Sequence, residues 1–254
     1  MRRSARGHGA DPEAPEATDG QSAAHSIGQV PLLESVNLGV PRAVRAKSGS
    51  TGIDKVPAPG PVLVSVPGPK GSGTSGLAGD VICDANNHGG GSQAVYAYAR
   101  EDLDWWEVEL GEPLRSGRFG ENLTTTGLEV TDALIGETWR VGDSVVVQVT
   151  GPRIPCATFA VWMNRRGWLK EFTRRAHPGA YLRVLAPGEV RAGDPVVVES
   201  RPGHGVTVGA TFRALTLEPD LLPAVLEASE YLEEEIVARA TGRKPFVLFE
   251  EVGG

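Results

Sequence analysis

The chain has 254 residues, 40% of them hydrophobic, which suffices for one large or two small domains with a real core. Its formal net charge of -7 argues against a protein whose main task is to bind nucleic acid phosphates or an anionic membrane. Two cysteines cannot build a disulfide framework, and no apolar run approaches the roughly 20 residues of a membrane span. We therefore expect a cytoplasmic protein without nucleic acid or membrane partners.

The N-terminal residues 1–26 contain almost no large apolar side chain. They begin with basic residues but continue with Gly, Asp, Pro and Glu, unlike a secretion signal. Such a composition cannot offset the entropy cost of ordering, so this segment is predicted to be a disordered tail.

Short apolar stretches alternate with Gly, Pro and Asp turns along the rest of the chain, which is typical of strands. Two Gly-Asp pairs, Gly142-Asp143 and Gly193-Asp194, each precede a valine run and predict turns. The regular spacing favours a mainly β fold built as an antiparallel barrel or sandwich. The expected strands are 30–38, 61–66, 144–149, 181–185, 195–199 and 205–208.

Helices are expected to be few. Leu103, Trp106 and Leu110 lie on one face of a predicted helix over 98–110, and Gly111 is its stop. A second helix is predicted over 168–176, and the region 220–240 has helical periodicity. The glycine-rich stretch 67–79 has no apolar period and predicts a loop.

Cys156 follows a valine-rich strand and the sequence Gly-Pro-Arg-Ile-Pro. Because a strand cannot continue its ladder through two prolines, the chain should leave the sheet here and present the next side chain at a rim. Arg153, three residues earlier, would lower the pKa of this thiol if the two side chains converge. The thiolate attacks electrophiles and binds soft metals, whereas the alternative is a buried, unreactive cysteine.

Three further segments contain polar groups that could bind a ligand, each with a plainer alternative. His88 follows Asp80 and Asp84 and precedes consecutive glycines. It could act as an acid, a base or a hydrogen-bond donor, or it could cap the next helix. The polar segment 117–127 could surround a ligand or form a network of local turns. Lys55 could bind a ligand or be a solvated surface charge.

Taken in order, these segments resemble the MOSC domain family, the domain first named for the C-terminus of molybdenum cofactor sulfurase. The resemblance runs from about residue 33 to 240 and is nearest to the stand-alone bacterial YiiM-like branch. It rests on Thr51-Gly52-Ile53-Asp54-Lys55, Gly79-Asp80 with Asp84 and His88-Gly89-Gly90, Ala94-Val95-Tyr96-Ala97-Tyr98, Phe119-Gly120-Glu121-Asn122-Leu123, Ile135-Gly136-Glu137 and Pro152-Arg153-Ile154-Pro155-Cys156.

The resemblance implies a β-barrel-like domain over 27–208, with a few peripheral helices, and a small C-terminal helical segment and tail over 209–254. It also implies a molybdenum cofactor, with the metal bound to a pterin dithiolene and to Cys156, and pyridoxal phosphate binding at the level of the family. Cys156, His88 and Asp84 would be catalytic. The expected cofactor-binding residues are Lys55, Arg153, Glu121, Asn122, Thr124 and Thr125.

The family further implies a reductase of small N-hydroxylated compounds, such as hydroxylaminopurines, amidoximes and hydroxylamines. The sequence contains no cysteine-rich Fe–S motif and no Gly-x-Gly-x-x-Gly fingerprint, so electrons would come from a separate reductase. Two alternatives stay open: a sulfur carrier with a Cys156 persulfide, and a non-catalytic module that binds or delivers the cofactor. A homodimer is also open, and Cys83 departs from the family pattern and is expected to be buried.

Overall fold

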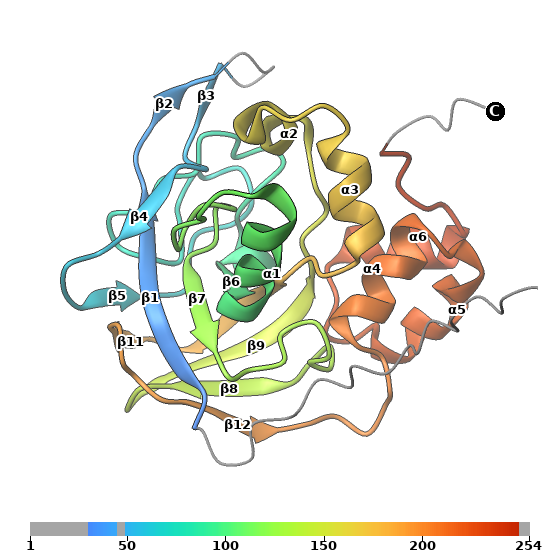
Figure 1. Cartoon of the computed structure of the whole chain (residues 1–254). Coiled ribbons are helices and arrows are strands. Elements are labelled where there is room, and N and C mark those ends of the chain that lie inside the picture. The colour runs from blue at the N-terminus through green and yellow to red at the C-terminus, as the bar shows by residue number, and fades with distance from the viewer. Residues whose placement is uncertain (1–29, 45–48, 249–254) are drawn as a thin grey trace, which may run out of the picture.

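A computed structural model describes residues 30–44 and 49–248. The predicted tail 1–26 lies outside this range. In the described part, a large mixed sheet lies beside a group of C-terminal helices (Figure 1). No helix there combines the length and apolar character needed to cross a membrane.

The main sheet has eight strands in the order β12-β8-β9-β10-β6-β7-β1-β4. All its pairs are antiparallel except β6 with β7. Its strands are β1 (Leu32–Gly39), β4 (Lys55–Pro57), β6 (Val95–Ala99), β7 (Leu123–Thr126), β8 (Thr138–Val141), β9 (Val145–Pro152), β10 (Ala180–Ala186) and β12 (Val196–Ser200).

The sheet-dominated fold is confirmed, but a closed barrel is not. In the described chain, β12 and β4 are the two edges of the ladder. One bridge, Leu32 to Pro195, brings β1 to the turn that precedes β12. Backbone hydrogen bonds of 2.8 Å join Leu33 to Asp194 and Gly193 to Leu33, but no ladder between β1 and β12 forms.

Two small ribbons and several helices complete the described fold. The ribbons are β2 (Arg42–Ala43) with β3 (Ser50–Thr51) and β5 (Val62–Val64) with β11 (Gly188–Val190). The first helices are η1 (Gly91–Gln93), α1 (Arg100–Leu110), α2 (Ala157–Met163) and α3 (Trp168–Arg175). The C-terminal helices are α4 (Val208–Thr216), η2 (Pro219–Leu221), α5 (Leu222–Val225), η3 (Leu226–Ala228) and α6 (Glu234–Gly242).

Helix α1 shows where the sequence pattern was sufficient and where it was not. Gly111 adopts a left-handed φ of 69° and ends the helix, as predicted. The predicted start at Tyr98 is wrong, because Tyr98 belongs to β6. All five residues of β6 are buried between β10 and β7, so sheet pairing overrides the helical pattern there.

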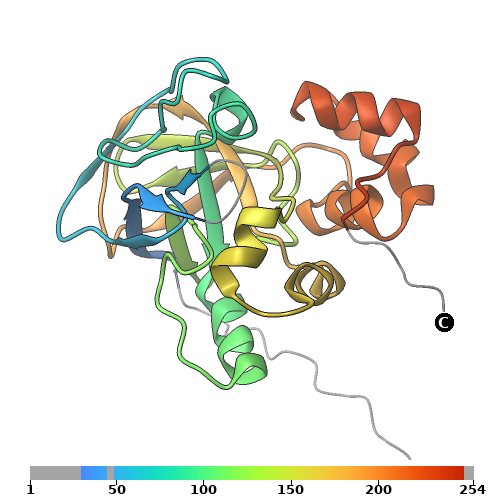
Figure 2. The ribbon, with the colours of Figure 1, turned by 90° about the horizontal axis from the view of Figure 1, so that it is seen from above.

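The C-terminal helices pack against the sheet instead of forming a separate core. Side chains of α4, α5 and α6 belong to the same hydrophobic cluster as the strands. Figure 2 shows these helices side by side at one flank of the sheet. The strand predicted over 205–208 is reduced to one β-bridge, between Thr207 and Leu134. Helix α4 begins at Val208, and Thr207 caps it by accepting a hydrogen bond from the backbone N–H of Ala210 at 3.0 Å.

A second, aromatic cluster fills the space between α1, α2, α3 and the sheet. Its centre is Phe119, whose ring lies 5.3 Å from the rings of both Tyr98 and Phe159. Trp106 is buried in this cluster, whereas Trp105 lies partly exposed under the Arg175 guanidinium. Tyr96 and Phe119 of this cluster also line the pocket that contains Cys156.

Candidate functional site

Cys156 is positioned by the strand break that the two prolines predicted. Strand β9 ends at Pro152, and α2 begins at Ala157. Cys156 is the last extended residue before this helix, with φ -121° and ψ 170°. Its thiol is partly exposed and lines a pocket instead of being packed away.

The pocket contains about 780 Å³ of space free of atoms, its open mouth included. Its walls come from segments far apart in the sequence: 50–55, 75–96, 119–122, 153–158 and Tyr181. Six of the predicted site residues meet here: Lys55, Asp84, His88, Asn122, Arg153 and Cys156.

The surroundings of the Cys156 thiol lower its pKa and favour the thiolate. Burial by itself raises its pKa, but a hydrogen bond from His88, the positive charge of Arg153 and the Phe159 backbone amide lower it to about 6. The group is therefore mostly thiolate at neutral pH. This is the form required of a nucleophile or a soft-metal ligand.

Arg153 lies almost fully buried beside this thiol, with 6% of its surface exposed. Its guanidinium carbon lies 3.8 Å from the centre of the Phe159 ring and 5.4 Å from that of Tyr96. The buried Nη1 atom has no hydrogen-bond partner among the residues that the structure describes. A buried N–H without a partner is costly, so this atom is suited to an anionic oxygen of a ligand.

His88 is positioned by a tight turn. The backbone N–H groups of Asn87 and His88 both bond to the carbonyl of Asp84, at 3.2 and 3.0 Å. Gly89 and Gly90 follow with φ 88° and 82°, a conformation that favours glycine. The next helix, η1, has no side-chain cap, so the alternative of His88 as a helix cap is wrong.

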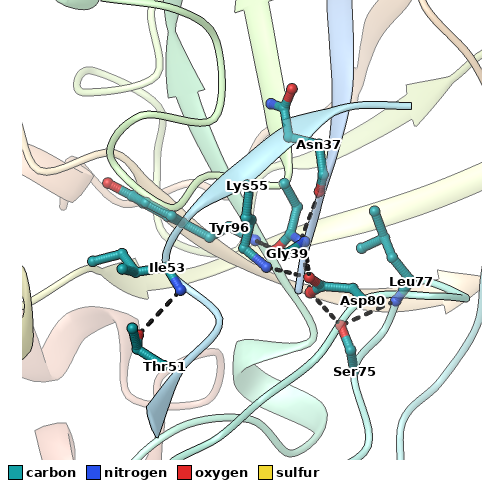
Figure 3. A network of polar contacts seen from close by, with 10 residues as sticks. Asn37, Gly39, Thr51, Ile53, Lys55, Ser75, Leu77, Asp80 and Tyr96 are labelled. Carbon is teal, nitrogen blue, oxygen red and sulfur yellow. Dashed lines mark hydrogen bonds and ion pairs between the residues drawn. The ribbon is translucent and has the colours of Figure 1, made fainter. Parts of the chain in front are cut away.

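Lys55 is neither a surface charge nor a free cation. Its ammonium group is buried and lies 2.5 Å from a carboxylate oxygen of Asp80, as Figure 3 shows. Burial alone would raise the pKa of Asp80, but the charge and hydrogen bond of Lys55 lower it below its usual range. Because Asp80 compensates its charge, Lys55 adds little net positive potential to the pocket.

Asp80 is the residue that sequence reasoning passed over. It also accepts hydrogen bonds from the Gly39 backbone, the Ser75 hydroxyl and the Asn122 amide, at 2.9, 2.8 and 2.9 Å. It thus joins β1, β4 and the loop before His88 in one network (Figure 3). The Gly79-Asp80 pair after a loop was visible in the sequence, but the Lys55 partner 25 residues away was not.

The remaining predicted cofactor residues lie behind the pocket wall. Glu121 is fully buried, and its carboxylate accepts hydrogen bonds from the Phe119 backbone at 3.0 Å and the Thr124 hydroxyl at 3.1 Å. Thr124 and Thr125 are also buried, in β7. Glu121 is held by local turn hydrogen bonds, whereas Thr124 accepts one from Asn37 of β1, and of these predicted residues only Asn122 lines the pocket.

Cys83 was expected to be buried, but it is partly exposed and lines the same pocket as Cys156. The two tyrosines Tyr96 and Tyr181 also line it and were not predicted. Burial raises the pKa of Tyr181 to about 12, so its phenol stays protonated.

The chain belongs to the MOSC family: the model described as "MOSC domain" matches residues 84–197. YflK of Bacillus subtilis, described as uncharacterized, is 35% identical over 176 residues, which cover 68% of this chain and 76% of that protein.

Two other relatives are similar over shorter shares. YiiM of Escherichia coli is 32% identical over 50% of this chain and 57% of its own length. A protein of Gibberella moniliformis named "Reductase" is 32% identical over 63% of this chain, which spans 29% of that protein.

Solved structures agree with this assignment. The crystal structure of YiiM from Geobacillus stearothermophilus superposes with a TM-score of 0.68 at 26% identity, covering 84% of this chain and 99% of that one. YiiM from Escherichia coli superposes with a TM-score of 0.60 at 25% identity, covering 76% and 89%. The chain is therefore a YiiM-like member of the family.

Proposed function

We propose that this protein is a molybdenum-cofactor-dependent reductase of N-hydroxylated compounds, with Cys156 as the protein ligand of the metal. The observation that carries this proposal is the pairing of an ionised Cys156 thiol with the unpartnered Nη1 atom of Arg153 in one pocket. A relative named as a reductase supports the reaction class.

The donor set fits a cofactor that brings its own metal ligands. In the described part of the chain, no group of three or more His, Cys, Asp or Glu side chains could hold a metal by itself. A pterin dithiolene would supply most of the coordination, and the soft thiolate of Cys156 would add one ligand. Arg153 would bind an anionic oxygen of the cofactor.

Reduction of an N-hydroxylated compound breaks the N–O bond, consumes two electrons and two protons, and releases water. The cofactor, when bound, supplies the two electrons at the metal. His88 lies beside Cys156 in the pocket wall and would donate a proton to the departing oxygen. The electrons would come from a separate reductase, which is the partner we propose.

The metal content of the purified protein tests the role of Cys156. The wild-type protein and the Cys83→Ser variant, both made in a host that synthesises the cofactor, should carry near one molybdenum per chain. Cys156→Ser should fold normally and carry almost none, measured by elemental analysis with circular dichroism as the folding check. Equal molybdenum in Cys156→Ser would exclude it as the ligand.

The same low-pKa, partly exposed thiol also suits the alternative of a persulfide carrier. Bound metal with turnover of an N-hydroxylated substrate supports the reductase. Sulfane sulfur on Cys156 without metal supports the carrier, and bound metal without turnover supports a binding or delivery module.

A further inference from the structure

A second pocket also borders Cys156. It lies between the end of β9, the start of α2 and the C-terminal helix α6, with about 1280 Å³ of space free of atoms, its mouth included. The two pockets share a border of six residues: Asp84, His88, Gln93, Cys156, Thr158 and Tyr181. A molecule in the second pocket would therefore border the thiol, whereas Lys55 and Arg153 line the first pocket only.

The two pockets differ in charge. The first is lined by the cations Lys55 and Arg153 and by the carboxylates Asp80 and Asp84, and Lys55 is already paired with Asp80. The second has no lysine or arginine among its described lining residues, and has the carboxylates of Asp84, Glu233 and Glu235. Its apolar lining residues are Ile154, Pro155, Ile236, Phe246 and Leu248.

Two of these carboxylates already have cationic partners outside the pocket lining. Glu233 pairs with Lys70 at 2.7 Å, and Glu235 pairs with Arg239 at 3.0 Å. Asp84 differs, because its two oxygens accept hydrogen bonds from the neutral Asn87 amide at 3.0 Å, and no described cation pairs with it. The uncompensated negative charge thus lies at the border with Cys156 and His88.

We propose that the second pocket is the substrate chamber and that it selects cationic N-hydroxylated compounds with an apolar body, such as N-hydroxyguanidines, over neutral and anionic ones. This inference rests on the proposed reductase function. Asp84 binds the delocalised cation next to the reacting N–O bond. The apolar wall around Phe246 and Ile236 holds the rest of the molecule. Phosphorylated substrates are disfavoured because the uncompensated carboxylate of Asp84 lies at the border with Cys156.

Three unreactive probes of nearly equal shape test the charge selection: benzamidinium, benzamide and benzoate. We expect benzamidinium to bind the purified protein about tenfold or more tightly than benzamide, and benzoate to bind weakest, by calorimetry or ligand-detected NMR. Asp84→Asn should remove most of the benzamidinium preference. Glu109→Gln, at an exposed carboxylate of α1 that lines neither pocket, should keep it.

Equal binding of the three probes, or a preference that survives Asp84→Asn, would overturn the inference. Binding of the probes needs no turnover, so this result is independent of the reductase assay. A loaded enzyme that reduces N-hydroxyureas faster than N-hydroxyguanidines would also overturn the inference and leave the proposed function standing. Charge-selective binding by a protein that reduces no N-hydroxylated compound would keep the chamber and reject the function.

Discussion

At the scale of single residues, the ionisation of Cys156 is the property that can be measured most directly. With a pKa lowered to about 6, the thiolate fraction should rise between pH 5 and 7. In a Cys83→Ser background, the rate of alkylation of Cys156 by iodoacetamide should follow this rise, measured by mass spectrometry. A midpoint at the ordinary thiol value would contradict the proposed environment of Cys156.

The lowered pKa of Cys156 also makes the stability of the fold depend on pH, in a direction that follows from the shift. A pKa that is lower in the folded than in the unfolded protein stabilises the fold above the unfolded value of 9.0, and this contribution is lost as pH falls through about 6. The difference in free energy of unfolding between the wild type and Cys156→Ser should therefore shrink as pH falls from 9 to 6.

Arg153 is expected to act on the thiol as well as on the cofactor. Arg153→Met keeps much of the apolar contact with Phe159 and removes the charge. The alkylation midpoint of Cys156 should move up by about 1 pH unit, because an opposite charge within reach favours the thiolate. Arg153→Lys, which keeps the charge, is the matched control and should move the midpoint less.

At the scale of elements, the Lys55–Asp80 pair is expected to hold β4 against the pocket loop. Lys55→Met alone leaves a buried carboxylate without its cation and should lower the free energy of unfolding by about 3–5 kcal/mol. The double variant Lys55→Met with Asp80→Asn should recover part of this loss. Urea unfolding of both single variants and the double variant measures the coupling, and strict additivity would argue against it.

The pair also predicts a loss of stability in acid. The pKa of Asp80 lies below its ordinary value of 3.8 in the folded protein, so its contribution is complete above that value and is lost as pH falls through the folded one. Wild type should lose more stability than Asp80→Asn when pH is lowered through this range.

The sequence predicted the elements whose signals are local, and missed those that depend on distant partners. The break after β9, the stop at Gly111 and the turns at Gly142 and Gly193 all follow from backbone preferences of Pro and Gly. The apolar run before Val208 was too short to distinguish strand from helix, although Thr207 was an available cap signal. Helix α2 begins at Ala157, and Cys156 before it makes no side-chain cap, so the sequence contained no local signal for the start of this helix.

The candidate site shows the same difference between local sequence signals, which could be predicted, and contacts between distant residues, which could not. Cys156, Arg153 and His88 lie in distinctive local sequences, and the structure brings them to one pocket. The burial of Glu121, Thr124 and Thr125, and the neutralisation of Lys55, depend on contacts across the sheet that no local pattern contains.

At the scale of the whole molecule, the second pocket exists only because the C-terminal helices are held against the sheet. One hydrophobic cluster joins them to the strands, and α6 contributes a wall of the pocket. Gly136, near the end of the loop before β8, lies under Tyr231 of the C-terminal region. A side-chain carbon at this position would lie 2.6 Å from the Tyr231 ring.

Gly136→Ala therefore tests whether the contact between Gly136 and Tyr231 determines both the free energy of unfolding and the binding capacity of the second pocket. Gly193→Ala is a matched control, because both glycines have a φ near 90° but a carbon at 193 would meet nothing within 4 Å. Both variants share the strain of a left-handed backbone. Gly136→Ala should lose about 1–3 kcal/mol more free energy of unfolding than Gly193→Ala, because its new carbon overpacks against Tyr231. Tyr231→Ala added to Gly136→Ala should remove most of that excess.

Urea unfolding gives the free energies, and benzamidinium binding should weaken in Gly136→Ala and persist in Gly193→Ala. Equal losses in the two glycine variants would show that the helices do not depend on this contact.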